Sequence, residues 1–137
     1  MNQTFEAILI YCLWSLFLTL IIITLRSFYT LTGKKAANSF ACTGEDVSEF
    51  SQRLIRAHAN CYENLPVAIG ILFTAILLGQ ENITNSLAFI FVALRILQSI
   101  THLINTSVIA VYIRFTFFII QILILIYWGL KLLLFTY

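Results

Sequence analysis

The sequence predicts an all-α fold, in which four long helices pack as a bundle inside a lipid bilayer. Hydrophobic residues make up 61% of the 137 residues and charged residues only 10%. Soluble domains are about half apolar and a quarter charged, so this composition indicates a membrane protein. The apolar residues also fall into long runs, and a helix that spans a membrane needs roughly 20 of them.

The length favours a single domain that covers residues 1–137. The net charge of +2 is too small to indicate a nucleic-acid partner. Because Cys12, Cys42 and Cys61 form no CxxC pair, we expect reduced thiols, without a disulfide framework or a metal site. The four helices are expected at about residues 5–26, 45–79, 86–105 and 108–134.

The first helix is expected from the uncharged run between Ala7 and Leu25, which Arg26 closes. This run lacks a basic start and a small-residue cleavage site, so we interpret it as a membrane helix rather than a signal peptide. Residues 27–51 then form the one sizeable polar connection.

The second helix is expected to begin near Glu45, because Glu45, Asp46 and Glu49 would suit the positive end of a helix dipole. It would be longer than the bilayer core, so its basic start should protrude into water. Pro66, the only proline, lies inside this helix and should loosen the preceding turn, residues 60–63.

A short polar turn is expected over residues 79–85, followed by the third and fourth helices. The fourth helix has a single charge, Arg114, before Lys131. The second connection carries no Lys or Arg, whereas basic residues cluster in and around the first. These are Arg26, Lys34, Lys35, Arg53 and Arg56. The positive-inside rule therefore places the first loop in the cytoplasm and both termini on the far side of the membrane.

Two helices carry matching polar stripes. On the second helix, Arg53, Arg56, Asn60 and Glu63 fall within an arc of about 80°. The third helix repeats this spacing. Its polar residues are Arg95, Gln98, His102 and Asn105. The second and third helices run in opposite directions, so both stripes lie toward the cytoplasmic side. Arg114 lies near the cytoplasmic start of the fourth helix, so we expect all these polar groups to converge on one layer near the cytoplasm.

An arginine at the bilayer centre costs about 2.5 to 3.5 kcal/mol on insertion scales. Arg56, Arg95 and Arg114 should therefore face protein or a water-filled cleft. Glu63 is the one carboxylate at that depth and is expected to pair with an arginine of a neighbouring helix. The surplus of positive charge favours an anionic ligand, because arginine suits bidentate carboxylate recognition.

Three residues allow more than one interpretation. Arg114 could stabilise a thiolate, or it could extend to the cytoplasmic interface. His102 lies on the polar stripe and could be a hydrogen-bonding core residue or an acid–base group. His58 lies off the stripe of its helix, so we expect it to face lipid headgroups or another subunit.

The segment Arg53-Leu-Ile-Arg56-Ala-His-Ala-Asn60-Cys-Tyr-Glu63-Asn-Leu-Pro66 resembles the family of membrane-associated proteins in eicosanoid and glutathione metabolism (MAPEG). This family includes microsomal glutathione transferases and leukotriene C4 synthase. Its second-helix pattern is R-x-x-R-A-x-x-N-x-x-E followed by proline. The resemblance covers essentially the whole chain, since the length, the four helices and the cytoplasmic loop also fit.

The resemblance implies a homotrimer with glutathione bound between subunits, toward the cytoplasm. Glu63 would hold the amino group of glutathione, and the arginines its carboxylates. Arg114 would correspond to the arginine that stabilises the thiolate. The glutathione-binding residues implied in this way are Arg53, Arg56, Asn60, Glu63, Arg95, Gln98 and His102.

The sequence departs from the family at the positions of three tyrosines. Asn64, Gln98 and His102 occupy them here, and the separation of Arg114 from His102 is longer than in the family. Gln98 and His102 can still form hydrogen bonds, but the stacking and hydroxyl contacts of tyrosine are lost.

We therefore expect a multi-pass membrane glutathione transferase or peroxidase-like protein, in a bacterial inner membrane or the endoplasmic reticulum. Glutathione would be the co-substrate, and a hydrophobic or lipid-derived electrophile would enter from the bilayer. One alternative is a non-catalytic member of the family that binds a lipid or an anion. Another is a small transporter subunit in which Glu63 and His102 relay protons.

Overall fold

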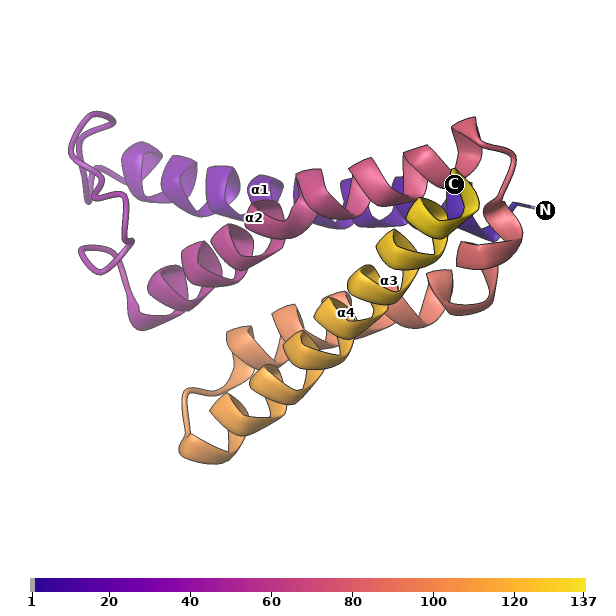
Figure 1. Cartoon of the computed structure of the whole chain (residues 1–137). Helices are drawn as coiled ribbons and strands as arrows, with labels where there is room; N and C mark the ends of the chain where they lie inside the picture. The colour runs from indigo at the N-terminus through magenta and orange to yellow at the C-terminus, as the bar shows by residue number, and fades with distance from the viewer. Residues whose placement is uncertain (1) are drawn as a thin grey trace.

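The computed structural model describes residues 2–137, and all of its regular structure is helical (Figure 1). The helices are α1 (Gln3–Leu31), α2 (Glu49–Leu77), α3 (Glu81–Ile104) and α4 (Val108–Phe135). Each of them is long and apolar enough to cross a membrane. The predicted all-α fold is therefore confirmed, with four helices that are long and apolar enough to span a membrane.

The helices do not contribute equally to the bundle. Helices α1, α2 and α3 all pack against one another, whereas α4 packs mainly on α3, touches α2 over a shorter length and does not contact α1. Both termini and the α2–α3 turn lie at one end of the molecule, and the long α1–α2 loop lies at the other (Figure 1). The core is built from α1, α2 and α3, and α4 contributes Ile124, Leu125 and Trp128.

Two helices extend beyond their predicted bounds, and side chains of α1 support the start of one of them. α1 continues past Arg26 to Leu31. α3 begins at Glu81, so residues 81–85, which were expected in a turn, are helical. There the Thr4 and Thr84 hydroxyls are 2.6 Å apart, and the Thr4 hydroxyl donates to Asn85 Oδ1 at 2.7 Å.

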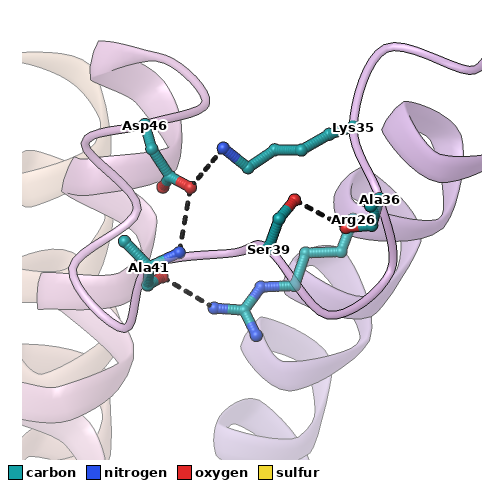
Figure 2. Close-up of polar contacts among 6 residues, drawn as sticks. All are labelled: Arg26, Lys35, Ala36, Ser39, Ala41 and Asp46. Atoms are coloured by element: carbon teal, nitrogen blue, oxygen red, sulfur yellow. Dashed lines mark hydrogen bonds and ion pairs between the residues drawn. The ribbon is translucent and has the colours of Figure 1, made fainter.

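The prediction that α2 begins near Glu45 is wrong. α2 begins at Glu49, and Ser48 caps it by accepting the backbone N–H of Ser51. Instead of lying in the helix, Asp46 organises the α1–α2 loop (Figure 2). Its carboxylate lies 2.6 Å from Lys35 Nζ and accepts the backbone N–H of Ala41 at 2.9 Å.

The α1–α2 loop is also fixed by Arg26 and by a glycine. Arg26 donates to the carbonyl of Ala41 at 3.3 Å, and its guanidinium lies 5.5 Å from the centre of the Phe40 ring. Gly44 has a φ of +73°, and a Cβ atom there would lie 2.7 Å from Cδ1 of Ile55. The loop is therefore tied to the end of α1 and packed against the start of α2.

We expect Asp46→Asn to loosen the α1–α2 loop. The ion pair with Lys35 and the Ala41 N–H hold the pKa of the Asp46 carboxyl below its ordinary value. A group with a lowered folded-state pKa stabilises the fold above its unfolded pKa, about 3.9, and this contribution is lost as the pH falls through the folded value. The protection factors for hydrogen exchange of residues 32–48, which correct for the pH dependence of the intrinsic exchange rate, should therefore fall below about pH 4 in the natural protein.

The Asp46→Asn variant should exchange fast in this loop already at neutral pH. Glu45→Gln is the matched control, because Glu45 is an exposed neighbour in the same loop. Equal exchange in the Asp46 variant and the natural protein at neutral pH would contradict this account of the loop.

Candidate functional site

A buried guanidinium lies at the centre of the bundle. Arg95 of α3 is 1% exposed, and its Nη1 donates to the backbone carbonyl of Asn60 at 3.0 Å. The guanidinium also lies 5.6 Å from the centre of the Tyr11 ring, within the range of a cation–π contact. Arg95 thus faces protein, as the sequence predicts, but its partners are a carbonyl and an aromatic ring rather than a carboxylate.

The turn of α2 before Pro66 receives hydrogen bonds from two neighbouring helices. Arg95 donates to the carbonyl of Asn60, and the Tyr11 hydroxyl donates to the carbonyl of Cys61 at 2.8 Å. α2 continues as a helix through Pro66, which lacks the N–H that would bond the carbonyl of Tyr62. Contacts from α1 and α3 therefore anchor the turn that the proline loosens, and they fix the position of Asn60.

A pocket of about 320 Å³ opens beside this anchored turn. Asn60 reaches it from α2, Gln98 and His102 from α3, and Arg114 from α4. The apolar part of its lining consists of Val111, Phe115 and Phe118. The structure thus brings together four of the predicted site residues from three helices, at one level of the bundle.

The electrostatic character of this pocket is positive. Its lining contains the guanidinium of Arg114 and no carboxylate. Arg56 lies near enough for its charge to act on both Arg114 and His102. Nε of Arg114 and Nδ1 of His102 are buried and have no partner within residues 2–137. An anionic group that accepts hydrogen bonds would complement this wall.

The other predicted site residues lie outside the pocket. Arg53 donates to the carbonyl of Leu103 at 3.0 Å and lies 3.9 Å from Glu49, so it joins the start of α2 to the end of α3. Arg56 and Glu63 are exposed on the outer surface of α2. Within residues 2–137, the expected ion pair between Glu63 and an arginine of a neighbouring helix is not formed.

His58 corrects a further prediction. It was expected to face lipid headgroups or another subunit, but its Nε2 lies 2.9 Å from the hydroxyl of Thr19 on α1. Its ring also packs against that of Tyr62, with the ring centres 5.2 Å apart. His58 thus joins α1 to α2.

Two residues of the site escape prediction from the sequence. Tyr11 supports Arg95, and Gln121 of α4 donates from Nε2 to Oε1 of Gln98 at 2.9 Å. Each is a lone polar group in an apolar run, and that isolation is the one signal that could have marked them. Among residues 2–137, no group of three or more His, Cys, Asp or Glu side chains could hold a metal ion.

Comparison with known protein families matches residues 4–134 to the MAPEG family. Because the match covers nearly the whole chain, this protein belongs to that family and is an integral membrane protein linked to glutathione and eicosanoid metabolism. No curated protein and no solved structure matches the chain.

We expect Arg95→Ala to lower the free energy of unfolding in detergent by about 2 to 4 kcal/mol, because it empties the space beside Tyr11 and removes the donor to Asn60. Thermal or denaturant unfolding measures the change. Leu97→Ala is the matched control on α3, since Leu97 is 47% exposed. A variant as stable as the natural protein would show that burying the guanidinium costs as much as its contacts contribute.

Proposed function

We propose that this protein is a membrane glutathione transferase or peroxidase-like enzyme. The observation that carries the proposal is the pocket in which Asn60, Gln98, His102 and Arg114 meet. It is positively charged, and it joins three helices at the level where the family motif of α2 lies. Glutathione carries two carboxylates, an amino group and a thiol, so it offers acceptors for the donors of this pocket.

The remaining charged residues of the motif support a site shared between subunits of a homotrimer. Arg56 and Glu63 are exposed on the surface of a single chain. A charge that faces lipid is costly, so these side chains need a partner surface or a ligand. A second copy of the chain would cover them. Glu63 would then bind the amino group of glutathione, and Arg56 a carboxylate.

Arg53 and Arg95 would contribute to this site from its edges. Arg53 ties the start of α2 to the end of α3, and Arg95 holds the carbonyl of Asn60. In this arrangement both residues shape the site, and the direct contacts to glutathione fall to Arg56, Asn60, Glu63 and the α3 residues Gln98 and His102.

The chemistry would begin with the thiol of glutathione near Arg114. A guanidinium stabilises a thiolate, and the thiolate is the reactive nucleophile. In a transferase reaction, its sulfur forms a bond to an electrophilic carbon of a hydrophobic substrate from the bilayer, as the bond from that carbon to a leaving group or to an epoxide oxygen breaks and that group takes the electron pair. In a peroxidase reaction, two glutathione molecules reduce a lipid hydroperoxide to an alcohol and water and leave as a disulfide. With the first loop in the cytoplasm, glutathione would enter from that side of a bacterial inner membrane or the endoplasmic reticulum.

A second candidate is a non-catalytic member of the family that binds a lipid or an anion. It is favoured by an apolar groove of about 360 Å³ between α2 and α4, which Val67, Ile71, Leu125 and Gly129 help to line. Asn64, in place of a family tyrosine, also lies in this groove. A purified protein that binds glutathione but never conjugates a model electrophile or reduces a lipid hydroperoxide would support this candidate.

We expect Arg56→Ala and Glu63→Gln each to abolish glutathione-dependent activity, because each removes a charge that would hold one end of glutathione. Activity with a model electrophile and glutathione binding by calorimetry measure the effect. Lys131→Ala and Glu45→Gln are the charge-matched controls, since both residues are exposed and lie outside α2. Full activity in either motif variant would refute this site.

Arg114→Ala should leave glutathione binding largely intact but reduce turnover by a factor of about 100 to 1,000, because an electrostatic group at the reacting atom is lost. The ultraviolet absorbance of the thiolate, which should appear when glutathione is added to the natural protein, should also disappear. Lys131→Ala on the same helix is the control. An unchanged thiolate signal in the Arg114 variant would assign Arg114 to the membrane interface instead.

A further inference from the structure

A pair of buried glutamines joins α3 to α4 beside the pocket. Gln121 is fully buried and Gln98 is 4% exposed. Nε2 of Gln121 donates to Oε1 of Gln98 at 2.9 Å and to the backbone carbonyl of Phe117 at 2.9 Å. Gln98 also lines the pocket, whereas Gln121 lies behind it. The two amides thus form a chain that leads from the backbone of α4 to the pocket.

The direction of this hydrogen-bond chain is fixed by the backbone. The two ends of a glutamine amide differ, since the oxygen only accepts and the nitrogen donates two hydrogens. The carbonyl of Phe117 can only accept, so the atom of Gln121 beside it must be the nitrogen. The second hydrogen of that nitrogen points to Gln98, which must therefore present its oxygen to Gln121. Turning either amide over would place two like atoms against each other.

The consequence for the pocket is a fixed donor. With its oxygen engaged by Gln121, Gln98 has both N–H groups of Nε2 free, and no protein acceptor engages them within residues 2–137. The neighbouring groups on the same wall are the Arg114 guanidinium and the His102 ring. This wall has no carboxylate, so the group that complements it is an oxygen acceptor that bears negative charge.

We propose that Gln121 is a positioning residue that locks the Gln98 amide with its NH2 toward the pocket and thereby makes this wall a subsite for a carboxylate. The inference rests on the proposed function, in which glutathione supplies the carboxylate. It adds that one carboxylate of glutathione lies against the Gln98 NH2, while Arg114 faces the thiol as proposed above. It also explains how glutamine can serve where the family has a tyrosine, since an oriented amide replaces the lost hydroxyl donor.

The competing account is that the glutamine pair only holds α3 and α4 together. Polar side chains commonly form hydrogen bonds between membrane helices, and such a role requires no ligand. It predicts that Gln98 and Gln121 affect the stability of the fold, but it predicts no coupling between them in ligand binding. Gln121→Leu also removes the unpartnered Oε1 of Gln121, so this variant should fold.

A double-mutant cycle separates the two accounts. Glutathione affinity is measured by calorimetry in detergent for the natural protein, Gln98→Leu, Gln121→Leu and the double variant. We expect Gln98→Leu to weaken binding about 10-fold, because it removes one hydrogen bond to a charged group. Gln121→Leu should weaken binding about 3- to 10-fold, because the Gln98 amide is then no longer held in the binding orientation. The double variant should bind no more weakly than Gln98→Leu. Additive losses, or no loss in Gln121→Leu, would overturn the proposal.

Thr116→Val is the matched control for these affinities. Thr116 is an exposed residue of α4, its hydroxyl bonds to the carbonyl of Tyr112, and it does not line the pocket. The Thr116→Val variant should bind glutathione with the same affinity as the natural protein.

A measurement without ligand tests the orientation of the amides directly. In protein labelled with nitrogen-15 at glutamine, the side-chain NH2 of Gln121 should exchange slowly with water, because both of its hydrogens are bonded and buried. The NH2 of Gln98 should exchange fast through the pocket. The reverse order, or slow exchange at both residues, would overturn the proposal. Should the natural protein not bind glutathione at all, the proposed function fails, and the exchange rates still decide the role of Gln121.

Discussion

The fold depends on how the bundle accommodates the Arg95 guanidinium, which lies almost fully buried without a carboxylate beside it. Such a group is costly in a membrane, so its position must be supported by other polar or aromatic partners. The support comes from the carbonyl of Asn60 and the ring of Tyr11, on two different helices. The same contacts hold the turn of α2 before Pro66, which bears the family motif. One buried cation thus joins the core of α1, α2 and α3 to the site.

The other half of the architecture follows from the position of α4. Because α4 packs chiefly on α3 and only briefly on α2, a seam remains between α2 and α4. The polar pocket opens at the Asn60 level of this seam, and apolar grooves lined by residues such as Ile71 and Gly129 continue along it. A hydrophobic molecule in the bilayer would find apolar walls leading toward a polar end. This arrangement suits a reaction between a water-soluble thiol and a lipid-soluble partner.

The charges that remain on the surface support the proposal that the site is shared between copies of the chain. Arg56 and Glu63 belong to the same motif as Asn60, yet they point outward and have no partner of opposite charge within residues 2–137. Inside the bundle, by contrast, polar groups such as Tyr11 and Gln98 are bonded. The two unpaired charges on the outer face of α2 are what favour a shared site between copies of the chain.

The sequence by itself determined the four helices, because runs of apolar residues as long as the bilayer is thick leave no other folded arrangement. It also identified the family, because the family pattern can be recognised from residue spacing alone, without knowledge of the fold. The residues of that pattern are Arg53, Arg56, Asn60, Glu63 and Pro66. The convergence of Gln98, His102 and Arg114 could be predicted as well, since helix direction and depth follow from the loops.

Only the tertiary structure decided which polar groups meet. The sequence predicted Asp46 within α2. In the structure Asp46 lies in the loop before α2, where it binds Lys35 and the Ala41 N–H. Nor could the sequence predict that Arg95 would pair with a carbonyl and with Tyr11, or that Gln121 would orient Gln98. Helical periodicity specifies the face on which a residue lies. Which partner that residue meets depends on how one helix is rotated and shifted against the next. That rotation and shift result from the packing of side chains that are distant in the chain.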